Sequence, residues 1–213
     1  MKLIGFIRRR SDLDFEAFSR HWRTTHRMHA EKLRPWLNGY VQAHYRPGPL
    51  PGVQRPADGS PILWVDGPET MLALASSEEC RSGAIPDEAL FMEGASSGLA
   101  VEPVVVLPAT GTAAVTLMLF AHGRPGTPRA TLEGDWLCPT RYACSRTVNH
   151  AVAGQDIDPA FAFDAIEEIG WPDEATFRAD WASSRSPGKL PWLKPAGFKA
   201  ALVNRIEVFA PPD

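Results

Sequence analysis

The clearest pattern in the chain is a helical stripe of apolar positions between Asp14 and Leu33. At 100° per residue, the stripe gathers six side chains within about a quarter-turn of one another. They are Phe15, Phe18, Trp22, His26, His29 and Leu33. His26 therefore lies in the middle of the buried face of a predicted helix. An imidazole in this position is either a core histidine bonded to a backbone carbonyl or the floor of a pocket, and both interpretations stay open at this point.

Short β-type runs predict strands in two comparable series. The first series is Lys2–Ile7, Asn38–Tyr45, Pro61–Asp66 and Val101–Leu107, and the second is Ala114–Ala121, Thr140–Asn149, Ala162–Ile169 and Ala200–Phe209. In each series a helix start follows the third strand and leads to the tripeptide Ala-Ser-Ser, at 75–77 and at 182–184. Each half thus has the order βαββαβ, the ferredoxin-like arrangement of one antiparallel sheet with two helices on one face.

The predicted fold class is α+β, with two ferredoxin-like repeats that bury their bare sheet faces against each other in a body of the dimeric α/β-barrel type. The break between the repeats is expected near Pro108–Thr112, which gives one repeat over 1–110 and a second over 111–213. Gly134 and Pro139 shorten the first helix of the second half to about Pro128–Leu137. A long functional helix is therefore expected in the first half alone.

Composition narrows the classes of protein. The chain has 213 residues, 44% of them hydrophobic and 22% charged, which is ordinary for a soluble globular protein. A net charge of −3 without a basic stripe argues against nucleic acid as a partner. No apolar run approaches the roughly 20 residues of a membrane span, and the charges at the N-terminus follow the apolar run, the reverse of a secretory signal. Three scattered cysteines, Cys80, Cys138 and Cys144, fit a reducing cytoplasm.

Several segments of the first half together resemble the EthD family of small dimeric α/β-barrel proteins. They are KLIGFIRRR at 2–10, LDFEAF at 13–18, HWRTTH at 21–26, GYVQAH at 39–44 and PDEALF at 86–91. The resemblance covers 1–107 well and 114–210 weakly, because the second half has neither the Trp-Arg pair nor the helix histidine. It implies proton-transfer chemistry on small, flat, oxygenated molecules, without a metal or organic cofactor. Relatives include proteins of ether degradation, dehydratases of polyketide or anthrone-like compounds and an isomerase of muconolactones.

His26 is the candidate catalytic residue. Burial lowers the pKa of an imidazole and keeps it neutral, and a neutral, desolvated imidazole is a competent general base near pH 7. Trp22, one turn earlier on the stripe, is expected to contact the substrate. The spacing of His26 and His29 suits two metal ligands, but nothing in the sequence completes a ligand set, so we predict no metal.

The second predicted strand supplies a polar face. Tyr40, Gln42 and His44 alternate on one side of it, and the more apolar set on the other side is expected to pack on the helices. The polar face would then line a pocket, extended by Trp64 and Asp66 of the third strand. The other interpretation is a face open to solvent at one end of the sheet.

Arg146 is the candidate in the second half, because its guanidinium donates two parallel hydrogen bonds to a carboxylate or enolate. An ordinary surface arginine, or an internal ion pair with Glu167, is the alternative. The segment 46–60 is rich in Pro and Gly and is either a lid, a contact arm or a passive insertion.

The expected function is that of a cofactor-independent lyase or isomerase acting on a small aromatic, polyketide-like or lactone compound. The alternatives are a non-catalytic protein that binds a small molecule or haem, with His26 or His44 as the axial ligand, and a purely structural subunit. The expected partner is a small-molecule substrate, and both a monomer and a homodimer are compatible with the sequence.

Overall fold

The computed structural model describes residues 1–48, 50, 53–94, 97–134, 140–184 and 190–212. The first half of the chain contains β1 (Lys2–Phe6), α1 (Phe15–His21), η1 (Trp22–His26), α2 (Arg27–Lys32), β2 (Gly39–Tyr45), β3 (Gly59–Trp64), α3 (Pro68–Ser76), η2 (Glu79–Ala84), α4 (Ile85–Phe91) and β4 (Ser97–Leu107). The second half contains β5 (Val115–Gly123), α5 (Arg129–Glu133), β6 (Ser145–Ala151), β7 (Ala165–Trp171), α6 (Glu174–Ala182) and β8 (Leu193–Phe209). Helices and antiparallel strands together confirm the α+β class.

The predicted long helix is confirmed as α1, η1 and α2 in direct succession. It begins after Asp14, whose side-chain Oδ1 accepts a hydrogen bond from the backbone N–H of Ala17 at 2.7 Å. The middle segment, η1, is a π-helical turn, a feature often found at functional sites. Four positions of the predicted stripe are buried, Phe18, Trp22, His26 and Leu33, while Phe15 and His29 are half-buried. Ser19 and Ala30, which the stripe did not include, are buried as well.

Two compact units divide the chain. Unit 1 comprises 1–47, 57–100 and 205–213, and unit 2 comprises 48–56 and 101–204. Strands β4 and β8 each run from one unit into the other, so the units do not coincide with the two halves of the sequence. Hydrogen bonds link the strands in a closed order, which contains β4-β1-β3-β2 and β8-β5-β7-β6. When the strands of each half are numbered 1 to 4 along the sequence, both halves therefore have the same order in the sheet, 4-1-3-2.

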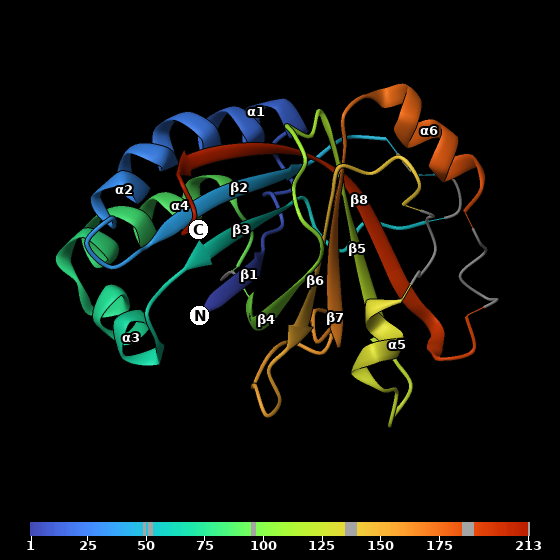
Figure 1. The fold of residues 1–213 in the computed structure, drawn as a ribbon. Helices are drawn as coiled ribbons and strands as arrows, with labels where there is room; N and C mark the ends of the chain where they lie inside the picture. Colours follow the sequence, from blue (N-terminus) through green and yellow to red (C-terminus); the bar gives the residue numbers. More distant parts are fainter. Residues whose placement is uncertain (49, 51–52, 95–96, 135–139, 185–189, 213) are drawn as a thin grey trace. The chain divides into compact units, whose positions relative to one another are not determined.

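In unit 1, the helices lie on one side of β1, β3 and β2 (Figure 1). The register pairs Leu63 with both Leu3 and Tyr40, so these three side chains share one face of the sheet. They pack in a cluster with Ala30 and Leu33 of the long helix and its continuation. The other face carries Ile4, Val41 and Ile62, which are also paired in register.

In unit 2, an apolar core forms around β5 and β7, where Leu117, Leu119 and Ile169 are fully buried. Two described residues of segment 46–60 take part in this core: Leu50 belongs to it and Val53 packs against it. Helix α5 ends at Glu133, and residues 135–137 of the predicted helix lie outside the described residues. No helix in the described ranges has the length and apolar character needed to cross a membrane.

Candidate functional site

A cavity of about 190 Å³ lies in unit 1, and His26 lines it. Most of its wall is apolar and comes from the helices and from the sheet face that carries Tyr40: Ile7, Trp22, Ala30, Leu33, Leu37, Pro61, Leu63, Met71, Leu74, Ala84, Phe91 and Met92. Its polar groups are His26, Tyr40, Cys80 and Glu88. An apolar pocket with a few convergent polar groups is the usual form of a small-molecule site.

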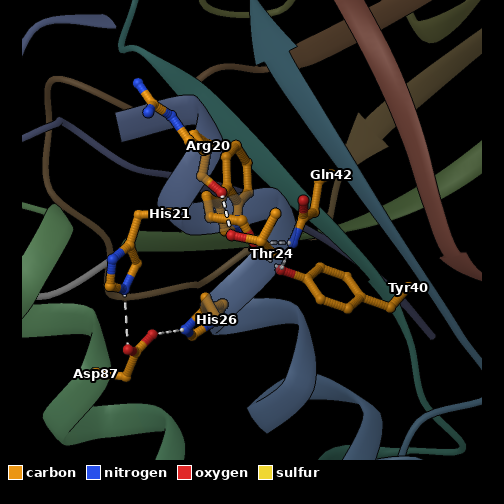
Figure 2. Close-up of polar contacts among 8 residues, drawn as sticks. Arg20, His21, Thr24, His26, Tyr40, Gln42 and Asp87 are labelled. Carbon is orange, nitrogen blue, oxygen red and sulfur yellow. Dashed lines mark hydrogen bonds and ion pairs between the residues drawn. The ribbon is translucent and has the colours of Figure 1, made fainter. Parts of the chain in front are cut away.

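His26 is held by a carboxylate 61 residues further along the chain. Its Nδ1 lies 2.9 Å from Oδ2 of Asp87, and His21 Nε2 lies 2.9 Å from the other oxygen, Oδ1 (Figure 2). Asp87 is 5% exposed and projects from α4 between the two imidazoles. A carboxylate accepts hydrogen bonds, so His26 carries its proton on Nδ1 and presents the lone pair of Nε2. No residue in the described ranges bonds to Nε2 of His26, which leaves this nitrogen available to a ligand.

Burial lowers the pKa of His26, and the hydrogen bond and charge of Asp87 partly oppose that effect. The imidazole is therefore neutral near pH 7, as expected from the sequence, and it is positioned by a buried acidic partner. A neutral imidazole oriented by a carboxylate is the arrangement of a general base.

Glu88, next to Asp87 on α4, is the second titratable group of the cavity. Burial raises its pKa to about 7, and the neighbouring charge of Asp87 adds to the shift. A substantial share of Glu88 is therefore protonated at neutral pH and can donate a proton. A histidine with a lowered pKa and a carboxyl with a raised pKa in the same cavity form a base and an acid that work at the same pH.

Tyr40 places a hydroxyl in the same wall. Its oxygen accepts a hydrogen bond from Nε1 of Trp22 at 3.1 Å, and Gln42 Nε2 lies 3.5 Å away (Figure 2). Burial raises the pKa of Tyr40 to about 12, so the phenol stays neutral and keeps its own O–H as a donor. The π-helical turn is supported from this strand as well, because Gln42 Nε2 donates to the backbone carbonyl of Trp22 at 2.9 Å.

The predicted orientation of β2 is wrong. Tyr40, Gln42 and His44 face the helix, and the apolar set with Val41 takes the other face. The prediction assumed that polar side chains avoid the helix layer, but that layer offers them polar partners: the Trp22 indole and carbonyl and the Ser19 hydroxyl. Hydrogen bonds to these groups offset the desolvation cost of burying a polar face.

Of the three side chains on this face, Tyr40 lines the cavity, whereas Gln42 and His44 are not among the described residues of its wall. His44 is 1% exposed; its Nδ1 lies 2.9 Å from the Ser19 hydroxyl and its Nε2 3.1 Å from Gln42 Oε1. Burial lowers the pKa of His44 to about 3. With both ring nitrogens occupied, His44 is a core histidine, and neither substrate contact nor haem ligation follows from its position.

Three further candidates lie elsewhere. Trp64 pairs in register with Lys2 and Gly39 on the sheet face away from Tyr40, and Asp66 is exposed and accepts a hydrogen bond from Asn38 at 2.6 Å. Arg146, in unit 2, forms a buried ion pair with Glu167, the alternative considered for it from the sequence. None of the three is among the described residues of the cavity wall.

Asp87 and Glu88 are the functional candidates that analysis of the sequence did not select. Their signal was present as the Asp-Glu pair in the PDEALF segment, which carried part of the family resemblance but no assigned role. Within the described ranges, no cluster of three His, Cys, Asp or Glu side chains is placed to hold a metal ion.

Comparison with known proteins bears on the same part of the chain. Residues 10–95, which include His26, Asp87 and Glu88, match the family model of the EthD domain. Over this segment, the resemblance to the EthD family noted in the sequence is confirmed. No curated protein matches the sequence.

Solved structures share the fold of this chain over nearly its whole length. An anthrone oxidase-like protein aligns with a TM-score of 0.58 and 9% identity, covering 97% of this chain and 92% of that chain. A proposed monooxygenase from Fusobacterium nucleatum aligns with a TM-score of 0.52 and 9% identity, covering 96% of this chain and 90% of that chain. A proposed monooxygenase from Lactobacillus acidophilus aligns with a TM-score of 0.51 and 7% identity, covering 96% of this chain and 92% of that chain. At these identities the likeness establishes the fold alone.

Proposed function

We propose that the protein is a cofactor-independent lyase or isomerase that moves protons on a small oxygenated molecule bound in the unit 1 cavity. The observation that carries this proposal is the buried His26–Asp87 pair, in which Asp87 bonds to Nδ1 of the imidazole and leaves Nε2 available. His26 lines the same cavity as Glu88. The anthrone oxidase-like relative is consistent with a ring-shaped, oxygenated substrate, although its likeness in itself concerns the fold.

The proposed chemistry uses three polar groups of the cavity, His26, Tyr40 and Glu88. Nε2 of His26 takes a proton from a carbon next to a substrate carbonyl, and the electron pair of the C–H bond moves onto the carbonyl oxygen. The Tyr40 O–H donates a hydrogen bond to that oxygen as its charge develops. The protonated carboxyl of Glu88 then delivers a proton, either to another carbon in an isomerisation or to a departing hydroxyl, which leaves as water.

The test measures proton transfer directly and needs no knowledge of the natural substrate. The protein is incubated in D₂O with cyclohexanone or phenylacetone, and deuterium entry at the carbons next to the carbonyl is followed by proton NMR. A positioned general base contributes roughly 10²- to 10⁴-fold to rate, so His26→Ala should lose that much of the exchange above buffer. Met28→Ala, exposed on the same helix and outside the cavity wall, is the control and should retain the wild-type rate.

Two results would count against a catalytic role. Exchange at the buffer rate with wild-type protein, while either ketone binds, would favour the non-catalytic binding protein. Wild-type exchange in a folded His26→Ala variant would remove His26 from the mechanism. The haem alternative draws little support from the cavity, whose volume of about 190 Å³ is close to that of a cavity of roughly 150 Å³ that holds one benzene molecule.

We also propose that the chain is a tandem of two ferredoxin-like repeats with a degenerate second copy. The shared element order βαββαβ and the shared strand positions 4-1-3-2 support this proposal. In the second copy, the five residues of α5 stand where the first copy has α1, η1 and α2. The free thiols of Cys80 and Cys144 agree with a cytoplasmic location, and Cys138 lies outside the described residues.

A further inference from the structure

The wall of the unit 1 cavity has a one-sided charge pattern. Its described residues include no Lys or Arg, and its single carboxyl is Glu88. The imidazole of His26 could also carry a positive charge, but it is neutral near pH 7 because it is buried. Asp87 is not part of the described wall and both of its oxygens lie 2.9 Å from an imidazole, so it makes no direct contact with a ligand, while its negative charge adds to the repulsion of an anion.

An anionic ligand would therefore lose its hydration without gaining a cationic partner. Burying an unpaired charge is strongly unfavourable, and the ionised fraction of Glu88 adds repulsion. A cationic ligand would meet a single carboxyl that is itself partly protonated near pH 7. One buried ion pair seldom repays the desolvation of both charges, so a cation gains little here.

The volume sets the size of the occupant. An apolar cavity of roughly 150 Å³ holds one benzene molecule, and this cavity measures about 190 Å³. The additional space accommodates one small substituent. The aromatic rings of Trp22, Tyr40 and Phe91 in the wall suit the faces and edges of a flat ring.

From these observations we infer that the cavity takes an uncharged compound of about one ring that carries a small oxygen substituent, and that Glu88 helps to exclude anions. The inference rests on the proposed function for the location of the site and narrows its substrate class. Among the compounds expected from the sequence, it favours neutral aromatic or polyketide-like molecules and disfavours lactones that carry a carboxylate.

The experiment compares three probes of nearly equal size that differ in charge: benzyl alcohol, benzoate and benzylamine. Dissociation constants are measured at pH 7 by ligand-observed NMR and by calorimetry on the full chain. Benzyl alcohol should bind at least about tenfold more tightly than either ion, the penalty for an unpaired buried charge. Glu88→Gln should reduce the disadvantage of benzoate relative to benzyl alcohol, whereas Glu79→Gln, an exposed position outside the wall, should leave it unchanged.

Two further variants locate the binding. Ala84→Leu fills the cavity and should weaken benzyl alcohol by about tenfold or more, since little room for a ring remains. Ala89→Leu, exposed on α4, is the matched control and should bind as the wild type does. Because an overfilled variant can misfold, Leu74→Ala provides the opposite change: it enlarges the cavity and should improve binding of 2-naphthalenemethanol relative to benzyl alcohol.

Equal or tighter binding of benzoate or benzylamine would overturn the inference, and so would binding that survives in a folded Ala84→Leu variant. Failure of all three probes to bind would overturn it as well. The deuterium-exchange assay reports separately on the proposed function. Selective binding of benzyl alcohol without exchange would keep the inference and refute catalysis, while exchange combined with a preference for benzoate would do the reverse.

Discussion

Asp87→Asn is the most informative single change, because Asp87 joins two imidazoles through its two oxygens at 2.9 Å each. The replacement keeps the shape of the side chain but turns one acceptor oxygen into an NH₂ donor. One of the two imidazoles then faces a donor with its own N–H. If that imidazole is His26, the ring must move its proton to Nε2, and the lone pair on that nitrogen is lost.

The magnitude follows from burial. A hydrogen bond to a charged group contributes about 1.5–3 kcal/mol where it is well buried, and less where water competes. His26 and Asp87 are 9% and 5% exposed at their side chains, whereas His21 is 24% exposed. Loss of one bond and weakening of the other should lower the free energy of unfolding by about 2 kcal/mol. For a chain of this length that is a drop in Tm of about 4–8 °C.

The assay combines thermal unfolding, followed by circular dichroism, with deuterium exchange of cyclohexanone. Exchange should fall by at least about tenfold, the lower end of the effect of removing a group that orients a reactive histidine. Asp12→Asn is the matched control: its ion pair with Arg10 is exposed, and such pairs contribute about 0–1 kcal/mol. A Tm within 1 °C of the wild type together with unchanged exchange would refute the positioning role of Asp87.

Three other predictions concern pH, packing and charge. Burial raises the pKa of Glu88 to about 7 in the folded chain, so the folded state loses stability as pH rises from the unfolded pKa near 4.5 to the folded pKa near 7. Glu88→Gln should therefore stabilise the protein more at pH 8 than at pH 5. Equal effects at the two pH values would contradict this. Gly59→Ala should lower the free energy of unfolding in urea by about 1–3 kcal/mol, since the new Cβ would lie 2.5 Å from an indole carbon of Trp22. Gly98→Ala is the control: its Cβ meets no atom within 4 Å, so the free energy of unfolding should be nearly unchanged. Arg146→Met should cost about 3–5 kcal/mol by removing the guanidinium that forms an ion pair with the buried Glu167 carboxylate. The double variant with Glu167→Leu should recover much of that loss, which a double-mutant cycle would measure.

Local patterns along the sequence were sufficient for the long helix and the order of the strands, but they did not predict helix α4, which carries Asp87 and Glu88. The long helix, its buried stripe and the order βαββαβ all depend on side-chain periodicity within short segments, which a chain carries in its own sequence. The limits of the helix are also local, since Asp14 caps its first turn. The π-helical turn at Trp22–His26 was not predicted, because it depends on a partner from β2 that bonds to the Trp22 carbonyl.

The orientation of β2 shows where local reasoning fails. Polarity alone cannot say which face of a strand meets the helices, because the energy of a buried polar side chain depends on the partner that the opposite layer supplies. Gln42 and His44 find such partners in the Trp22 carbonyl and the Ser19 hydroxyl. Their hydrogen bonds convert a face that resembles a pocket lining into part of the core.

The sequence by itself determined that His26 lies on the buried face of a long helix and that its imidazole is neutral near pH 7. Only the tertiary structure decided what that imidazole does, because its partner Asp87 and the neighbouring Glu88 come from a helix more than 60 residues further along the chain. Periodicity reports the environment of one segment, whereas a hydrogen bond between distant segments depends on how the helices pack on the sheet. The cavity has the same origin, since its volume is the space that the packed side chains of unit 1 leave unfilled.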